Sequence, residues 1–175
     1  GQEIKAALLY SARHVDAVEL VRAVIDLGQN KYSNYIGNLF HHPSVSLHVD
    51  DGRNFLRAKQ SKYDIIQIFS NHTSSSVAAG TGAAGTNYLQ TAEAYKEYFS
   101  HLNENGILHI NHYYYRKMIT TAALAWSQMG RDDFQKHVIV YEYSRDETQP
   151  TLLIKMQPWT EAEVQSLNNF FNAKF

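Results

Sequence analysis

Hydrophobic residues follow two alternating patterns along the chain. Apolar positions three or four residues apart predict helices, and the short alternating or continuously apolar runs between them predict strands. The predicted strands are His14–Leu20, Val45–Val49, Tyr63–Phe69, Ile107–Tyr114, His137–Tyr143 and Thr151–Gln157. The predicted helices are Gln2–Ala12, Val21 to about Phe40, Gly52–Lys59, Thr91–Leu102 and Lys117–Met129, and a last helix begins at Thr160.

Local signals refine these elements. Gly28 weakens the second predicted helix, so an interruption of this helix around Gly28 is an alternative. Asn105-Gly106 has the residue types that stop a helix, here before the fourth predicted strand. Glu163 lies three residues after Thr160, the spacing of a capping box. The third predicted strand is a largely apolar run, as in a parallel strand that is buried on both faces.

The order of the elements predicts an α/β fold with a mostly parallel sheet. Strands that alternate with helices along a chain pair in parallel through right-handed crossovers. The last two strands are joined by a short polar segment alone, so they predict an antiparallel hairpin at the C-terminal side. Ligands of such sheets bind beyond the carboxyl ends of the strands, and the candidate chemistry is expected there.

Composition limits the partners. The chain has 175 residues, 44% hydrophobic and 19% charged, as expected of one globular domain over 1–175. A net charge of −1 offers no basic surface to nucleic acid. No apolar run has the length of a membrane span, and we expect no direct membrane contact from this segment. The absence of cysteine excludes disulfides and fits a reducing, cytoplasmic compartment.

Acidic residues stand at the ends of two consecutive predicted strands. Glu19 closes the first, where a carboxylate can accept hydrogen bonds from both hydroxyls of a ribose. A carboxylate favoured by a helix N-terminus is an equal alternative. Asp51-Gly52 follows the second strand, where Asp can bind the exocyclic amine of adenine and Gly lets the base approach, although an N-cap explains Asp51 alone. Together the two acidic ends predict a nucleoside pocket.

The segment Gly80–Gly85 matches the G-x-G-x-x-G pattern of dinucleotide-binding turns. In that motif the glycines directly follow a strand and open a helix. Here a stretch rich in serine and alanine separates them from the preceding strand. We therefore expect no cofactor site at these glycines. A lid over the acceptor site and a disordered linker are the open alternatives.

The nine histidines form no metal-binding pattern. His109 and His112 are three residues apart on a predicted strand and so point to opposite faces, and the adjacent His41 and His42 diverge on a helix. We expect no metal site. Tyr113–Tyr115 could wall an acceptor pocket, although aromatic packing against the next helix is the simpler alternative.

Three longer stretches resemble one protein family: "GQEIKAALLYSARHVDAVELVRAVIDL", "VDDGRNFLRAKQSKYDIIQI" and "YLQTAEAYKEYFSHLNENGIL". In order and spacing they are similar to the spermidine synthase-like branch of the class I S-adenosylmethionine-dependent methyltransferase fold. The resemblance covers nearly the whole chain and implies a Rossmann-like fold. It is strongest to bacterial spermidine synthase-like proteins, in which such a domain often accompanies a multi-span membrane region. The resemblance therefore leaves membrane attachment of the parent protein as an alternative.

The resemblance also implies a cofactor, S-adenosylmethionine or its decarboxylated form. Gly1 corresponds to the last part of the glycine-rich turn that holds the methionine part of the cofactor. Glu19 corresponds to the residue that holds the ribose, and Asp51 and Gly52 to the pair that meets the adenine. Phe69, which closes the following strand, is the remaining expected cofactor-binding position.

The chain departs from the family at its N-terminal side. It begins at Gly1, so the family's first strand and most of the glycine turn lie outside it. In the family that strand lies between the strand ending at Glu19 and the strand ending at Phe69. Without it two strand edges are exposed, and they must close on each other, rearrange or pair with another chain. We expect an incomplete sheet or a homo-oligomer through these edges, and weak cofactor binding by this chain alone.

The second departure concerns the reaction itself. In aminopropyltransferases, the strand that corresponds to Tyr63–Phe69 is followed by D-S-S-D, whose acidic groups orient and deprotonate the amine. This chain has Phe69-Ser70-Asn71-His72 at those positions. Phe69 cannot act as a base, whereas His72, with an ordinary pKa of about 6.5, is the candidate catalytic base. A cationic polyamine would lose its anionic recognition, which argues against spermidine synthesis by the usual mechanism.

Three functions stay open. The first is methyl transfer from S-adenosylmethionine to a small acceptor that the sequence does not identify, since a sulfonium needs little beyond a positioned nucleophile. The second is a degenerate, non-catalytic nucleotide-sensing or interaction domain. The third is an aminopropyltransferase with an altered amine site. The sequence favours the first for the parent protein and predicts that this chain by itself is inactive.

Overall fold

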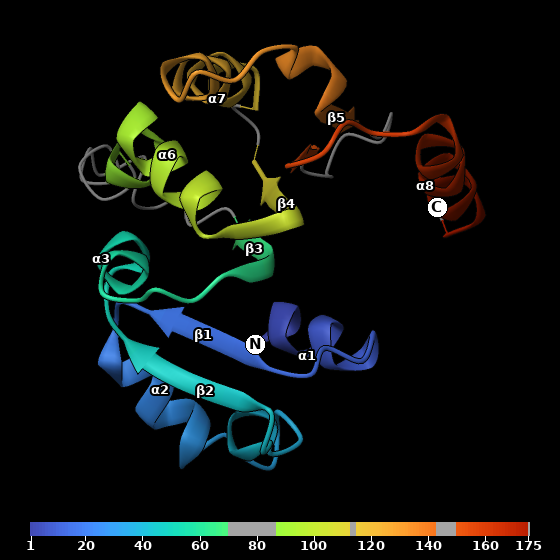
Figure 1. Ribbon diagram of the computed structural model, residues 1–175. Coiled ribbons are helices and arrows are strands. Elements are labelled where there is room, and N and C mark those ends of the chain that lie inside the picture. Colours follow the sequence, from blue (N-terminus) through green and yellow to red (C-terminus); the bar gives the residue numbers. More distant parts are fainter. Residues whose placement is uncertain (70–86, 113–114, 143–149, 175) are drawn as a thin grey trace, which may run out of the picture. The chain divides into compact units, whose positions relative to one another are not determined.

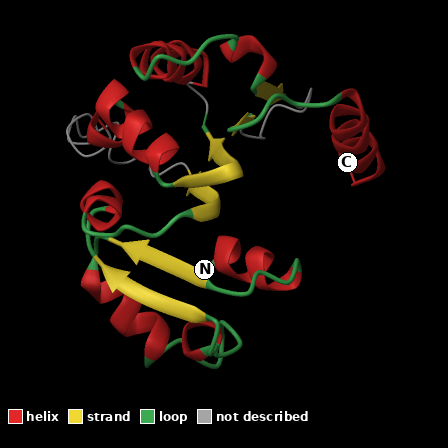
Figure 2. Ribbon diagram, viewed as in Figure 1, coloured by secondary structure: helices red, strands yellow, loops and turns green. Residues whose placement is uncertain are grey.

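The computed structural model of the chain describes residues 1–69, 87–112, 115–142 and 150–174 (Figure 1). The chain divides into two compact units, Gly1–Lys59 and Gln60–Phe175. Each unit combines helices with parallel strands (Figure 2), so the predicted α/β class is confirmed.

The first unit has a parallel two-stranded sheet. Its strands are β1 (Val15–Glu19) and β2 (Val45–Val49). Its helices are α1 (Gln2–Leu9), α2 (Arg22–Gln29), α3 (Gly52–Arg57) and the short 3-10 helix η1 (Leu39–His41). The buried apolar side chains of this unit are Ile25, Phe55 and Leu56, so its core is small.

The second unit has a four-stranded sheet of order β3-β4-β6-β5. Its strands are β3 (Tyr63–Phe69), β4 (Leu102–Asn111), β5 (Val138–Tyr141) and β6 (Thr151–Lys155). Its helices are α6 (Ala92–Ser100), α7 (Tyr115–Gln128), α8 (Glu161–Lys174) and the 3-10 helices η2 (Asn87–Gln90) and η3 (Phe134–Lys136). β3 and β4 are parallel, whereas β5 and β6 form the antiparallel pair that the sequence predicts.

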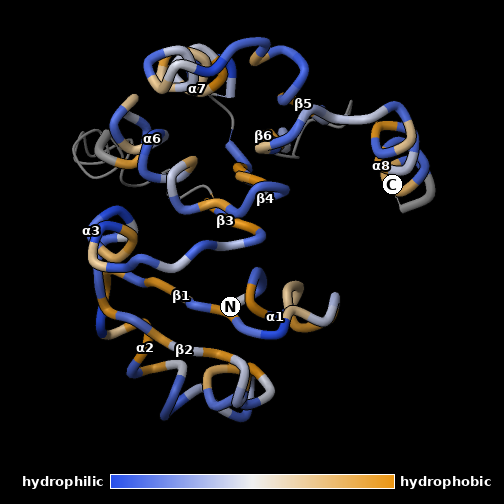
Figure 3. The backbone as a smooth tube through the Cα atoms, in the orientation of Figure 1, coloured by the Kyte–Doolittle hydropathy of each residue, from blue (hydrophilic) through white to orange (hydrophobic). Residues whose placement is uncertain are grey.

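The main core of the second unit lies between its sheet and the helices α6 and α7. β3 and β4 bring hydrophobic stretches to it (Figure 3), among them the fully buried Leu108. Phe99 of α6 meets Trp126 of α7 edge to face, with the ring centroids 5.1 Å apart. On the opposite face of the sheet, Lys155 of β6 is bonded to Glu163 of α8. The sheet is therefore covered on both faces at its β6 side.

The two sheets are separate. Within the described part of the chain, β1 is bonded to β2 alone and β3 to β4 alone. These are the two strands that the resemblance placed on either side of the family's first strand. The expectation that β3 is buried on both faces is wrong: Ile65 and Phe69 are 60% and 49% exposed among the residues that the structure describes.

The second helix is shorter than predicted. It ends at Gln29 instead of continuing to about Phe40. The reason is a close contact that only the fold creates: a Cβ at Gly28 would lie 2.4 Å from the ring of Phe40, so the returning chain packs directly on this glycine. Gly37 and Asn38 then take positive φ values of 67° and 54°, which turn the chain toward β2.

The predicted helix stop at Asn105-Gly106 is also wrong. α6 ends at Ser100, and Leu102 already pairs with Tyr63. Asn105 and Gly106 therefore lie inside β4. The register between β3 and β4 shifts here, and a Cβ at Gly106 would lie 2.9 Å from that of Leu102. The glycine therefore permits an irregular strand and does not end a helix.

The predicted capping box at the start of α8 is confirmed. The Glu163 N–H donates to Thr160 Oγ1 at 3.3 Å, and the Thr160 N–H donates to Glu163 Oε2 at 2.9 Å. Each side chain thus satisfies a backbone donor that the first helical turn leaves open.

Candidate functional site

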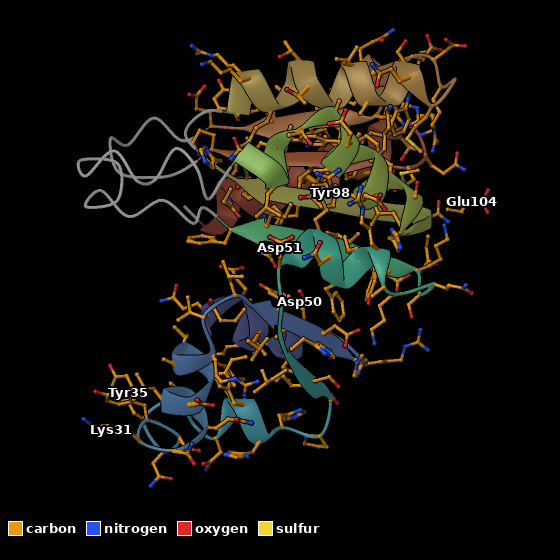
Figure 4. The ribbon with its side chains drawn as sticks, turned by 90° about the vertical axis from the view of Figure 1, so that its left-hand side faces the viewer. Lys31, Tyr35, Asp50, Asp51, Tyr98 and Glu104 are labelled. Atoms are coloured by element: carbon orange, nitrogen blue, oxygen red, sulfur yellow. The ribbon has the colours of Figure 1, made fainter. Side chains whose placement is uncertain are left out.

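The carboxyl ends of β1 and β2 lie side by side in the first unit. Glu19 is in register with Val49, and the Asp50 N–H donates to the Glu19 carbonyl at 3.2 Å. The chain then passes through Asp51 into α3 (Figure 4). The two acidic strand ends predicted from the sequence are therefore brought to one edge of one sheet, where ligands of parallel sheets bind.

Glu19 is half-buried and already makes one structural bond. Its Oε1 accepts a hydrogen bond of 2.9 Å from the N–H of Val21, the N-cap residue of α2. The alternative of a carboxylate at a helix N-terminus is thus present in the structure. This bond engages one carboxylate oxygen, Oε1.

Asp51 is the N-cap of α3, as the structural alternative in the sequence analysis predicts. Its Oδ1 accepts from the N–H groups of Arg53 and Asn54 at 3.0 and 3.2 Å. Gly52 is the first residue of the helix. These bonds fix the orientation of the carboxylate and engage one of its oxygens.

Two neighbouring residues lie at the strand ends where chemistry is expected, but the sequence assigns them no role. Asp50 adds a second carboxylate at this strand end, and its Oδ1 accepts from the Asp51 N–H at 2.7 Å. Leu20 follows Glu19 and is 68% exposed, which places an apolar side chain next to the acidic groups. The sequence places both at strand ends, because Leu20 is the last residue of the first predicted strand and Asp50 directly follows the second.

The other predicted site residues belong to other parts of the chain. Gly1 precedes α1, and its carbonyl accepts from the Lys5 N–H at 3.1 Å. Phe69 ends β3 in the second unit. His72 and the segment Gly80–Gly85 lie outside the described residues, so the candidate base and the lid or linker stay predictions.

Three polar side chains meet at the carboxyl ends of β3 and β4 in the second unit. Gln90, Tyr95 and His112 line one small recess there, together with apolar side chains. His112 is 2% exposed, and its Nε2 lies 3.4 Å from Nε2 of Gln90. His109 lies on the other face of β4, where burial lowers its pKa.

Two further observations concern other kinds of site. In the part of the chain that the structure describes, no group of three or more His, Cys, Asp or Glu side chains gathers as metal ligands would. The helices described here all fall short of the length and hydrophobicity that crossing a membrane requires.

Comparison with known proteins assigns the chain to a family. Residues 3–142 match the model of the spermine/spermidine synthase domain. The chain belongs to this family. A polyamine aminopropyltransferase of Alkaliphilus metalliredigens is 37% identical over 98 residues, which are 56% of this chain and 31% of that protein. A polyamine aminopropyltransferase of Clostridium perfringens is 34% identical over 94 residues, which are 54% of this chain and 30% of the relative.

Solved structures show the same fold at low sequence identity. Spermidine synthase from Thermotoga maritima matches with a TM-score of 0.56 and 15% identity, over 86% of this chain and 48% of that one. An rRNA methylase from Streptococcus thermophilus matches with a TM-score of 0.51 and 18% identity, over 87% of this chain and 80% of that one. The Rossmann-like fold shared by methyltransferases and spermidine synthases is thereby confirmed. The chain itself spans about a third of the length of the curated relatives it matches.

Proposed function

We propose that this member of the spermine/spermidine synthase domain family serves aminopropyl transfer from decarboxylated S-adenosylmethionine, with an acceptor site that differs from that of its named relatives. The observation that carries the proposal is the pairing of Glu19 and Asp51 at adjacent carboxyl ends of two parallel strands. The relatives, which are polyamine aminopropyltransferases by name, support the choice of reaction.

The first unit supplies the groups for the nucleoside. Glu19 Oε2 would accept a hydrogen bond from a ribose hydroxyl, while Oε1 holds the Val21 N–H. Asp51 Oδ2 would accept from the exocyclic amine of adenine, while Oδ1 caps α3. The exposed Leu20 would pack against the apolar face of the base. Each carboxylate is oriented in advance by its backbone bonds, which lowers the entropic cost of binding.

The reaction needs a positioned nucleophile and a base. The acceptor nitrogen attacks the carbon bound to the sulfonium sulfur, so a C–N bond forms while the C–S bond breaks. The electron pair of the C–S bond goes to sulfur, which leaves as a neutral thioether, and the proton of the nitrogen passes to a base. His72 is the candidate for this base, because Phe69 replaces the first acid of the family motif.

Methyl transfer from S-adenosylmethionine, which the sequence analysis favoured, is the second candidate. It has the same chemistry at sulfur and needs the same nucleoside pocket. The rRNA methylase and this chain share a fold at 18% identity, and this likeness supports the fold alone. A non-catalytic nucleotide-sensing domain is the third candidate, favoured by the absence of both acids from Phe69-Ser70-Asn71-His72.

A calorimetric titration of the full-length protein with each of the two sulfonium compounds, followed by mass spectrometry of reaction mixtures, separates these candidates. We expect the decarboxylated compound to bind and its aminopropyl group to appear on an acceptor. Binding of the carboxylated compound with a methylated product would replace this proposal by the second candidate. Binding without turnover would favour the third, and binding of neither compound would overturn the nucleoside pocket.

A further inference from the structure

The recess lined by Gln90, Tyr95 and His112 is small and mostly enclosed by the second unit. It lies at the carboxyl ends of the parallel strands β3 and β4, under α6 and α7. Its volume is about 10 Å³, which is room for about one water-sized group. Apolar side chains such as Ile68, Ile110 and Met118 complete its lining, so a group bound here would be largely removed from water.

Tyr95 carries a hydroxyl for which the structure provides no partner. The residue is fully buried, and among the described residues nothing accepts from or donates to its Oη. Burial raises the pKa of Tyr95, so the hydroxyl stays protonated at neutral pH and is able to donate. A buried hydroxyl without a hydrogen bond is unfavourable, and a group that enters the recess would relieve that cost.

Gln90 and His112 supply the other polar atoms of the recess. Their Nε2 atoms are 3.4 Å apart, with Gln90 at the end of η2 and His112 directly after β4. The Gln90 and His112 Nε2 atoms are thus within hydrogen-bonding distance of each other. A small polar group in a buried space needs two to four hydrogen-bonding partners, and the Tyr95 hydroxyl and the carbonyl oxygen of the Gln90 side chain supply two. No carboxylate is among the described residues that line the recess.

We propose that Tyr95 and Gln90, the latter positioned by His112, bind one uncharged hydrogen-bonding group of the acceptor, either a hydroxyl or an unprotonated nitrogen. That the ligand is the acceptor rests on the proposed function; the chemistry of the recess does not. An ammonium group would enter a buried space without a counter-charge, and an unpaired buried charge costs far more than a buried hydroxyl that is hydrogen-bonded.

The same preference accounts for the departure at the end of β3. Phe69 also lines the recess and stands where the resembling aminopropyltransferases have the first acid of their motif. An acceptor with an uncharged end has no use for that carboxylate. The loss of the acid and the neutral recess thus describe one change, from a cationic acceptor end to a neutral one.

Equilibrium binding of two matched probes to the full-length protein tests this inference. The probes are butanediol and putrescine, which have the same chain length and differ in their end groups, hydroxyl against ammonium. Binding is followed by the NMR signal of the isotope-labelled Gln90 side-chain amide, without any sulfonium donor. We expect butanediol to shift this signal in a saturable way. Putrescine, added to the butanediol complex, should not displace butanediol and so should not reverse this shift.

Tyr95→Phe and Tyr98→Phe form a matched pair of variants on α6. Tyr98 is equally buried, but its hydroxyl donates to the Leu89 carbonyl at 2.9 Å. We expect Tyr95→Phe to weaken butanediol binding about 2- to 10-fold, the loss of one hydrogen bond, without lowering the melting temperature. Tyr98→Phe should keep butanediol binding and lower the melting temperature by about 2–4 °C.

Three results would overturn the inference: unchanged butanediol binding in Tyr95→Phe, putrescine binding as tight as that of butanediol, or no binding of butanediol by the unmodified protein. If the protein does not bind the sulfonium donor, only the proposed function is contradicted, because butanediol and putrescine are titrated without that donor. The two proposals therefore fail by different measurements.

Discussion

At the scale of single residues, Glu19 and Asp51 each combine a structural bond with a predicted ligand contact on the same carboxylate. In both, the recorded backbone bonds fall on one oxygen, Oε1 of Glu19 and Oδ1 of Asp51. The competing explanations of these residues, helix terminus and nucleoside ligand, are therefore compatible. Variants that separate the two roles are the sharpest test of the pocket.

Glu19→Ala should weaken binding of the sulfonium donor to the full-length protein by about 1–3 kcal/mol, the cost of losing a charge-assisted hydrogen bond. Asp26→Ala is the matched control, because Asp26 is an exposed acid on α2, beyond the strand end. Calorimetric titration measures both. An affinity for Glu19→Ala equal to that of the control would remove Glu19 from the pocket.

Asp51 allows the cap and the ligand contact to be separated chemically. Asn is as good an N-cap as Asp but carries no charge, whereas Ala has no capping group. We expect Asp51→Ala to lose about 1 kcal/mol of unfolding free energy and Asp51→Asn to stay close to the unmodified protein, as urea denaturation would show. Both variants should bind the donor more weakly. Asp51→Asn with normal affinity would leave this residue with a structural role alone.

At the scale of elements, the first turn of α8 couples a cap to the sheet. Glu163 completes the capping box with Thr160 and is also bonded to Lys155 of β6, which is 7% exposed. The hydrogen bond from Lys155, and next the backbone bond from Thr160, lower the pKa of Glu163 from 4.5 to about 2. One carboxylate thus fixes both the start of the helix and its position on the sheet.

This pKa shift predicts a pH dependence of stability. Because the pKa is lower in the folded state, the stabilisation is complete above about 4.5 and is lost as the pH falls toward 2. Glu163→Gln should lose roughly 1 kcal/mol at neutral pH, since solvent screens this half-exposed pair, and should flatten the decline between those pH values. Urea denaturation across that range measures it, with Glu161→Gln in the same helical turn as the control. An unchanged profile in Glu163→Gln would contradict the coupling.

At the scale of the whole molecule, β1 and β3 are edge strands of the two sheets in the described part of the chain. β1 and β3 are bonded on one side within the described residues, and Ile65 of β3 is 60% exposed. Unpaired edges with exposed apolar side chains favour pairing with another strand. The sequence predicts a homo-oligomer that forms through strand edges, and this stays a prediction. The exposed Ile65 on β3 names the edge at which it can be tested.

We expect this chain to associate as its concentration rises, and Ile65→Lys to shift it toward the monomer, because a lysine on an edge strand opposes pairing. Sedimentation velocity over a concentration series measures the association. Leu124→Lys is the control, since Leu124 is 52% exposed on the helix α7 and away from any strand edge. An equal effect of both substitutions would indicate general hydrophobic association, and a monomer at every concentration would remove the edge-pairing prediction.

The sequence by itself determined the element types, the parallel and antiparallel pairing and the acidic strand ends. These follow from local periodicity and from short-range signals such as the Thr160–Glu163 spacing, which act within a few residues of the chain.

The tertiary structure alone decided the features that depend on contacts between distant residues. α2 stops where Phe40 packs on Gly28, and β4 begins early because Leu102 pairs with Tyr63. The sequence places His112 at a strand end, but the meeting of His112 with Gln90 and Tyr95 in one recess joins three separate elements and was decided by the fold. Periodicity reports which face of an element is apolar, but not what will pack there, and that choice belongs to the fold.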